Sequence, residues 1–256
     1  MSEILLVDRL TKRFGGLKAV GGDKGLSFRV RKGAFLGLIG PNGSGKSTTF
    51  NLISGVMKPN AGSVMLEGID LSRIPASRIA SHGLGRTFQT PRAFPSLSVL
   101  DNVIVGADSA GETIGAVVSG RWRESESELA ERAKDVLERV GLSGRSRETV
   151  ANLSGGELRM LEVARQLVRQ PRILLLDEPT AGVDPSLQKK LSKVLVDLHG
   201  AGTTLIVVEH NLSFLLQIAD SVVVLQNGEL LSEGTPQEIK SDRKVIGAYL
   251  GAGHAA

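Results

Sequence analysis

The sequence predicts an α/β protein with a mainly parallel sheet, an antiparallel β edge and a helical insert. Short apolar runs alternate with helical segments from residue 35 onward, as in a parallel sheet that helices cover on both faces. The segment 26–30 instead alternates apolar and polar side chains, which is typical of an antiparallel strand with one wet face. Between about residues 90 and 152 the strand pattern stops, and an amphipathic helix is expected over 125–140.

Composition and charge restrict the class of protein. Hydrophobic residues make up 41% of the 256 residues and charged residues 23%, which is ordinary for a globular chain. The formal net charge is +4, with basic residues scattered rather than clustered. Aromatic residues are only 4%, so stacking surfaces for single-stranded nucleic acid are not expected, and we predict no nucleic-acid partner.

Cysteine usage and hydropathy exclude further classes. The chain has no cysteine, so it can hold neither a disulfide nor a thiolate metal site. Its first residues lack a basic region followed by an apolar stretch, so no secretory signal is expected. It also has no run of about 18 apolar residues, so no membrane-spanning helix is expected.

The elements are expected in the following order along the chain. Strands are predicted over 5–10, 26–30, 35–39, 63–66, 85–89, 173–176, 204–208, 222–225 and 229–232. Helices are predicted over 48–54, 75–81, 99–107, 125–140, 153–169, 185–200 and 212–219, with a final short helix from Thr235-Pro236. A turn is expected over 11–16, a hairpin around Asn227-Gly228, and a loose tail from Gly251 to Ala256.

One domain of three parts follows from this order. Residues 1–89 and 153–234 form the core, residues 90–152 a helical subdomain, and residues 235–256 a C-terminal helix and tail.

The loop Gly40-Pro41-Asn42-Gly43-Ser44-Gly45-Lys46-Ser47 fits the phosphate-loop pattern G-x-x-x-x-G-K-[ST] at every fixed position. An apolar strand precedes it and a helix follows, which is the context that the motif needs. Its glycines let backbone N–H groups surround a polyphosphate, and the helix N-terminus adds partial positive charge. Lys46 is then expected on the β- and γ-phosphates and the Ser47 hydroxyl on Mg²⁺, so ATP and Mg²⁺ are the expected cofactors.

Two carboxylates follow the apolar strand 173–176. Asp177 stands at the strand's C-terminal end, where α/β proteins bind ligands, and can hold Mg²⁺ through water. Glu178 can accept a proton from an attacking water. Alone, such a pair is as often a helix cap, and it is the upstream phosphate loop that favours a nucleotide site.

The segment Leu153-Ser154-Gly155-Gly156-Glu157 is open to two interpretations. The glycines and the serine at a helix start can present N–H groups and a hydroxyl to an anion. The same residues also form a good capping box, with Ser154 at the N-cap and Glu157 three residues later. Taken by itself, the segment favours the capping box.

The chain as a whole resembles the ATPases of ABC transporters over essentially its full length. The order and approximate spacing of that family recur at Gly40–Ser47, Gln89, Leu153–Glu157, Leu174–Glu178, Gly182–Asp184 and His210. The combination is far more specific than any single motif, and it implies a P-loop NTPase core of the ABC ATPase type.

This resemblance implies the roles of the remaining site residues. The signature Leu153–Glu157 would bind the γ-phosphate held by a second subunit, so the active unit would be a head-to-tail ATP sandwich dimer. Asp184 would lie in the loop that crosses the interface. Phe14 would stack on adenine beside Val20, although tyrosine is usual at the position of Phe14, and the long segment Gly21–Gly25 leaves the register up to Leu26 open.

The predicted site residues fall into three groups. The expected catalytic residues are Glu178, His210, Lys46 and Gln89. The expected metal ligands are Ser47, Gln89 and Asp177. The expected nucleotide-binding residues are Phe14, Val20, Asn42, Gly43, Ser44, Gly45, Lys46, Ser47, Thr48, Gln89, Ser154, Gly155, Gly156 and Glu157. Without the motif order, Gln89 would pass for a solvated strand tip, His210 for a cap and Phe14 for a packed aromatic.

A narrower resemblance concerns the transported solute. Arg86-Thr-Phe-Gln89, the Gly-rich segment 108–122 and Ala248-Tyr249-Leu250-Gly251 are similar to the longer ATPase of branched-chain amino-acid importers. Such a chain would work at the cytoplasmic face of the inner membrane with permease subunits, a second ATPase and, indirectly, a substrate-binding protein. Importers of urea or short amides share these features, and a soluble non-transport ABC ATPase is the more distant alternative.

Overall fold

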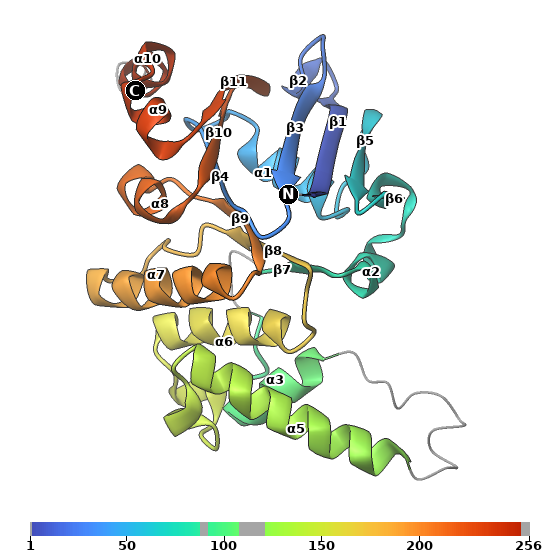
Figure 1. The fold of residues 1–256 in the computed structure, drawn as a ribbon, viewed down its shortest axis with the longest axis vertical. Helices are drawn as coiled ribbons and strands as arrows, with labels where there is room; N and C mark the ends of the chain where they lie inside the picture. The colour runs from blue at the N-terminus through green and yellow to red at the C-terminus, as the bar shows by residue number, and fades with distance from the viewer. Residues whose placement is uncertain (1, 88–91, 108–120, 252–256) are drawn as a thin grey trace.

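The computed structural model describes residues 2–87, 92–107 and 121–251 (Figure 1). The predictions for Gln89, for most of the Gly-rich segment and for the tail 252–256 lie outside the described residues. The strands gather in the upper part of Figure 1, and α3 (Val99–Gly106) and α5 (Arg121–Arg139) lie below them, with α6 (Gly155–Leu167) between.

A six-stranded sheet forms the centre of the core. Its order is β11-β10-β4-β9-β8-β7, and all neighbours are parallel except the edge strand β11. The strands are β4 (Phe35–Ile39), β7 (Leu84–Arg86), β8 (Ile173–Asp177), β9 (Thr204–Val208), β10 (Ser221–Gln226) and β11 (Glu229–Gly234). The predicted mainly parallel sheet with an antiparallel edge is confirmed.

The early strands form a second, antiparallel sheet. Its members are β1 (Glu3–Phe14), β2 (Leu17–Val20), β3 (Leu26–Arg31), β5 (Ala61–Leu66) and β6 (Ile69–Asp70). The turn expected over 11–16 was wrong at its start, because β1 continues to Phe14 and pairs with β2. The turn itself is confined to Gly15 and Gly16, and the polar residues before it form a cross-strand pair that their sequence alone does not reveal.

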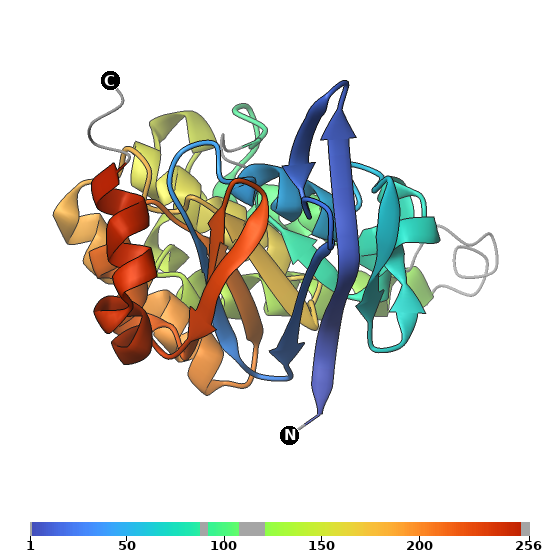
Figure 2. The ribbon, with the colours of Figure 1, turned by 90° about the horizontal axis from the view of Figure 1, so that it is seen from above.

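Each face of the parallel sheet has its own hydrophobic core. Leu36 and Leu38 of β4 pack with α1 (Lys46–Ile53) and the antiparallel sheet. Phe35 and Ile39 pack on the opposite face with the later helices. Gly37 on that second face permits close packing, since an added Cβ would lie 2.4 Å from Cδ2 of Leu215 in α8 (Leu212–Ile218). Figure 2 shows the antiparallel sheet and the C-terminal helices on opposite sides of the molecule.

The remaining helices largely follow the predicted order. They are α2 (Ala76–Ile79), α3 (Val99–Gly106), α5 (Arg121–Arg139), α6 (Gly155–Leu167), α7 (Pro185–Gly200), α8 (Leu212–Ile218), α9 (Pro236–Ser241) and α10 (Arg243–Gly251). The expectation of a single C-terminal helix was wrong, because α9 ends at Ser241 and a second helix, α10, follows. The side chain of Asp242 accepts a hydrogen bond from the N–H of Lys244 (2.8 Å), which starts this second helix.

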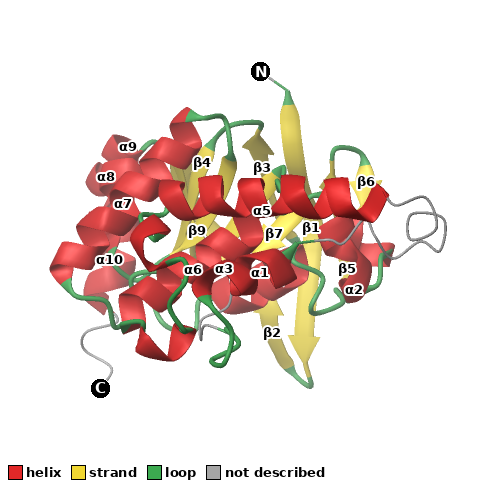
Figure 3. Ribbon diagram, turned by 90° about the horizontal axis from the view of Figure 1, so that it is seen from below, coloured by secondary structure: helices red, strands yellow, loops and turns green. Residues whose placement is uncertain are grey.

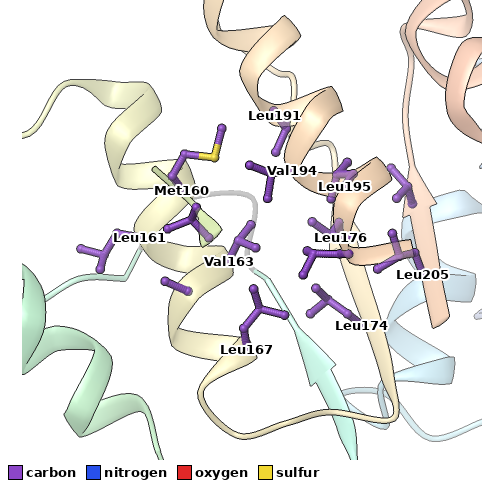
Figure 4. Close-up of a cluster of buried hydrophobic side chains, with 14 of the residues drawn as sticks. Met160, Leu161, Val163, Leu167, Leu174, Leu176, Leu191, Val194, Leu195 and Leu205 are labelled. Atoms are coloured by element: carbon purple, nitrogen blue, oxygen red, sulfur yellow. The ribbon is translucent and has the colours of Figure 1, made fainter. Parts of the chain in front are cut away.

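Helix α6 joins the helical part of the chain to the core. Its apolar side chains meet those of α7 and β8 in one buried cluster, as Figure 4 shows for Met160, Val163, Leu176 and Leu195. On its other side α6 lies against α3 and α5, which cover the underside of the molecule in Figure 3. Because α6 packs on both the core and the helical part, its contacts do not divide the two, and the predicted boundary between the helical subdomain and the core at residue 152 stays a prediction.

Within residues 2–87, 92–107 and 121–251, no helix combines the length and the hydropathy that crossing a bilayer requires.

Candidate nucleotide-binding site

The phosphate loop connects the end of β4 to the start of α1. Gly40, Gly43 and Gly45 all have positive φ, at 154°, 76° and 96°. A Cβ on Gly40 would lie 2.2 Å from the carbonyl oxygen of Leu225, so no larger residue fits there. Gly45 is the N-cap of α1, and no side chain caps this helix. The N–H groups of its first turn are therefore available to an anion.

Lys46 lies inside this loop and is 4% exposed. Its Nζ donates hydrogen bonds to the carbonyl oxygens of Gly40 (2.7 Å) and Pro41 (3.0 Å). Burial lowers the pKa of Lys46, and the charge of Glu178 acts against that shift. The hydroxyl of Ser44 is also buried but has no hydrogen-bond partner. An unpartnered donor and a desolvated cation beside a free helix N-terminus fit a bound polyphosphate.

A cavity of about 790 Å³ opens over the loop. Residues 42–48 form its floor, and Phe14, Leu17, Lys18, Ala19, His210 and Asn227 form its walls. Phe14 is 47% exposed at the tip of the β1–β2 hairpin, with Nζ of Lys12 5.6 Å from its ring centroid, and its ring can stack on a base in the cavity. The structure thus brings Phe14 and the phosphate loop into one cavity.

Val20 is placed differently from the expectation. Its side chain is 1% exposed, belongs to the core on the α1 face and is not part of the cavity lining. The strand alternation of β2 explains this position, because the side chains of Ala19 and Val20 point to opposite faces. Leu17, which is 67% exposed, and Ala19 offer the apolar neighbours of a base instead.

The tip of the β10–β11 hairpin supports the phosphate loop. Gly228 donates its N–H to the carbonyl oxygen of Ser44 (3.0 Å) and accepts a hydrogen bond from the N–H of Gly21 (2.6 Å). A Cβ on Gly228 would lie 2.6 Å from the carbonyl oxygen of Ala19, so glycine is required. The Asn-Gly pair predicts the hairpin from sequence, but nothing in it indicates contact with the phosphate loop.

Glu178 and His210 lie side by side at the ends of β8 and β9. Nε2 of His210 is 2.6 Å from Oε1 of Glu178, so a proton on this nitrogen is donated to the carboxylate. Glu178 adopts φ 46°, a conformation that costs a non-glycine residue about 1–3 kcal/mol. Its N–H donates to the carbonyl oxygen of Val208 (2.9 Å), which holds the strained residue against the next strand. Strain of this kind is common at functional sites.

Glu209 is a buried residue that the sequence analysis missed. Its Oε1 accepts the N–H of Thr180 (2.8 Å), and its Oε2 accepts the N–H groups of His210 (3.2 Å) and Asn211 (3.5 Å). Burial raises the pKa of Glu209, and the hydrogen bonds from Thr180 oppose this. The carboxylate therefore ties the segment after Glu178 to the segment that carries His210. The signal available in the sequence was an acidic residue directly after an apolar strand and directly before a histidine.

Asp177 and Ser47 were the predicted metal ligands with Gln89. Asp177 is buried at the end of β8, and burial raises its pKa while the nearby Arg86 opposes the rise. Ser47 is exposed on the cavity floor. Across the described parts of the chain, no three His, Cys, Asp or Glu residues cluster as metal ligands. One carboxylate from Asp177 and one hydroxyl from Ser47 suit Mg²⁺, which uses one or two carboxylates and completes its shell with water and phosphate oxygens.

The signature segment forms the capping box that its sequence predicts. Ser154 caps α6, and Oε2 of Glu157 accepts hydrogen bonds from the Ser154 N–H (2.9 Å) and hydroxyl (2.7 Å). These bonds lower the pKa of Glu157. Gly155 is open to solvent, whereas a Cβ on Gly156 would lie 1.3 Å from Cδ2 of Leu187.

The signature residues are not part of the cavity. None of Ser154, Gly155, Gly156 and Glu157 lines it. Asp184, also predicted near a dimer interface, caps α7 by accepting the N–H groups of Ser186 (2.9 Å) and Leu187 (3.2 Å). Leu187 connects the two, because its side chain lies beside Gly156 and its N–H is bonded to Asp184. Within one chain, the signature and Asp184 lie outside the nucleotide cavity.

A glycine-rich loop after a parallel strand, an uncapped helix start and a carboxylate pair at the end of β8 define a nucleotide-binding protein of the phosphate-loop class. The ABC transporter family model matches residues 24–181. A second model, described as branched-chain amino acid ATP-binding cassette transporter, matches residues 229–255. The chain belongs to the ABC transporter ATP-binding family, as its motif order predicted.

Curated relatives match nearly the whole chain. It is 38% identical to the high-affinity branched-chain amino acid transport ATP-binding protein LivG of Escherichia coli, over 98% of this chain and 99% of the relative. It is also 38% identical to a probable LivG of Archaeoglobus fulgidus, over 98% and 96%. The corresponding protein BraF of Pseudomonas aeruginosa is 36% identical, over 97% and 98%.

Solved structures agree with this assignment. An ATP-binding cassette of an ABC transporter in its ADP conformation superposes with a TM-score of 0.85 at 34% identity, covering 98% of this chain and all of the other. A dimeric cassette bound to ADP and phosphate gives 0.74 at 25% identity, covering 91% and 99%. The predicted ABC ATPase fold is confirmed, and the chain is an ATPase subunit of a membrane transporter.

Proposed function

We propose that this chain hydrolyses ATP to power an importer of branched-chain amino acids. The observation that carries the proposal is the pairing of the phosphate-loop cavity with the Glu178–His210 contact at 2.6 Å. Support for the solute comes from the C-terminal family match and from relatives that are named as branched-chain amino acid transport proteins. Related importers of urea or short amides remain the alternative, because the ATPase does not contact the solute.

The residues of the cavity have distinct tasks in this proposal. Phe14 stacks on the base, and the first-turn N–H groups of α1 hold the phosphates together with Lys46. In the structure Nζ of Lys46 donates to two loop carbonyls. It has to leave these carbonyls and turn toward the phosphates when nucleotide enters. Ser47 and Asp177 would hold Mg²⁺, which neutralises charge on the phosphate oxygens when it is bound.

Glu178 is the proposed general base. Its carboxylate accepts a proton from the attacking water, and His210 fixes the orientation of that carboxylate through the 2.6 Å contact. Glu209 holds both segments by accepting N–H groups from each, so the pair is set before nucleotide arrives. Such preorganisation is the main way in which phosphoryl-transfer enzymes lower the barrier.

The complete site needs a second cassette in this proposal. Ser154, Gly155 and Gly156 stand outside the cavity of their own chain, with Gly155 open to solvent. In a head-to-tail dimer they would cover the phosphates bound by the partner, which is an identical or homologous ATPase. The permease subunits and the cytoplasmic face of the inner membrane complete the assembly, with a substrate-binding protein as an indirect partner.

The experiment is ATP-driven uptake by the assembled transporter in vesicles. With the permease subunits, the second ATPase and the binding protein present, labelled leucine should accumulate and labelled urea should not. Glu178→Gln keeps a hydrogen-bonding group but lacks the basic carboxylate, so it should bind ATP, stop uptake and accumulate ATP-bound dimers. Uptake of urea without leucine would replace the solute assignment, and rapid hydrolysis by the variant would remove Glu178 as the base.

A further inference from the structure

Arg86, at the end of β7, is a largely buried cation that has no part in the mechanism described above. Its side chain is 14% exposed. One Nη donates to Oδ1 of Asn51 (2.8 Å), the other donates to the hydroxyl of Ser54, and the guanidinium lies 4.6 Å from the centroid of the Phe50 ring. All three partners belong to α1 or its C-cap, so the helix that begins at the phosphate loop fixes the guanidinium.

The fixed guanidinium faces the predicted metal ligand. Nη2 of Arg86 lies 3.7 Å from Oδ2 of Asp177, and the carboxylate is only 12% exposed. Burial raises the pKa of Asp177, and Arg86 opposes this rise more strongly than Arg159 or His210 does. A buried carboxylate without a cation would be costly, so Arg86 compensates Asp177 when no metal is present.

The length of the contact has a consequence for metal binding. At 3.7 Å the pair is longer than a charge-assisted hydrogen bond of about 2.7–2.9 Å, because the same Nη group is bonded to Asn51. Asp177 can therefore leave Arg86 while Arg86 stays in place. A metal ion that approaches Asp177 alone then meets a fixed positive charge, whereas one that arrives with nucleotide phosphates brings negative charge of its own.

We propose that Arg86 is a positioning residue that makes metal binding at Asp177 dependent on bound nucleotide. It balances the aspartate while the site holds no metal and opposes a divalent cation that comes without phosphates. This inference rests on the proposed role of Asp177 as a metal ligand.

The test measures binding of Mn²⁺, a paramagnetic substitute for Mg²⁺, by electron paramagnetic resonance with and without ADP. Arg86→Gln should bind Mn²⁺ alone about tenfold more tightly than the parent protein, because a like charge near the site is removed. The gain in Mn²⁺ affinity that ADP provides should shrink by the same factor. Arg86→Met keeps the apolar stem against Phe50 and should behave alike if the glutamine variant does not fold.

Two controls separate charge from packing. Arg165→Gln removes another guanidinium of similar exposure (15%), which lies 3.5 Å from Glu162 and 5.5 Å from the Phe94 ring centroid, and should leave Mn²⁺ binding unchanged. Arg86→Lys keeps the charge and should keep Mn²⁺ binding weak without ADP. Equal Mn²⁺ affinity in the parent and in folded Arg86→Gln or Arg86→Met would overturn the proposal, as would tight binding by Arg86→Lys.

The metal site itself has a separate control. Asp177→Asn should abolish Mn²⁺ binding in the presence of ADP. If ADP-dependent binding survives in that variant, Asp177 is not the ligand and the proposed metal site fails, whatever the arginine variants do.

Discussion

Replacing Gly156 by alanine tests how tightly the signature helix packs on α7. The new Cβ would lie 1.3 Å from Cδ2 and 2.6 Å from Cγ of Leu187, so the leucine must rotate or the two helices must separate. Overpacking of this kind costs about 1–3 kcal/mol. Alanine gains up to about 1 kcal/mol over glycine inside a helix, but Gly156 is in the first turn, where little of that gain is realised. We expect a net loss of about 1–2 kcal/mol.

Urea unfolding followed by circular dichroism measures this loss, with Gly155→Ala as the matched control. Gly155 has nothing within 4 Å of an added Cβ, so its substitution should change the free energy of unfolding by less than about 0.5 kcal/mol. Adding Leu187→Ala to Gly156→Ala should relieve the clash, with a coupling energy of at least about 1 kcal/mol in a double-mutant cycle. Equal stability of the two glycine variants would refute the reasoning.

Three other predictions concern the nucleotide cavity and its supports. Lys46→Ala should weaken ATP binding by roughly 10–100-fold, the equivalent of about 1.5–3 kcal/mol for a lost charged hydrogen bond, and calorimetry that finds near-normal affinity in the folded variant would remove Lys46 from the site. Glu209→Gln offers one acceptor oxygen in place of two, so it should lower the free energy of unfolding by about 1–3 kcal/mol. The variant should also hydrolyse ATP more slowly while its ATP affinity is kept, and turnover equal to the parent's would contradict the positioning role of Glu209. Tyr249 is the one tyrosine of the chain, and burial raises its pKa from 10.0 to about 12, so tyrosinate absorbance should appear only near pH 12 in the folded protein. Because the folded pKa is the higher one, its stabilising contribution is complete below pH 10 and is lost as pH rises toward 12, and Tyr249→Phe should not show that loss; titration near 10 in the folded chain would show that the ring is not buried.

Local patterns in the sequence were reliable where the interactions are local. The capping box at Ser154 and the helix start at Thr235 depend on residues three positions apart, so they form wherever their helices form. The Asn227-Gly228 turn and the phosphate loop have the same character, because the positive φ values they require are offered by glycine and asparagine. The turn at 11–16 was misjudged because polar residues in a hairpin depend on their cross-strand partner.

What lay beyond the sequence is the set of contacts between distant segments. The family resemblance implied that Val20 lies beside the base, but the pleat of β2 turns its side chain into the core. Glu209 belongs to no motif, and Arg86 enters the sequence analysis only as part of the segment that resembles the importer ATPases. The contacts of both appear only where β9 and β7 end beside β8. Their partners lie 29 and 91 residues away in the chain, at Thr180 and Asp177, respectively.

The sequence by itself determined the parallel strands, the capped helices and the phosphate loop, because each follows from apolar periodicity or from hydrogen bonds within a few residues. Only the tertiary structure decided that Gly228 supports Ser44, that Leu187 fills the space beside Gly156, and that Arg86 faces Asp177. These pairs depend on strand order and on the crossing of helices. Both are set by burial of apolar surface over the whole chain rather than by any short stretch of it.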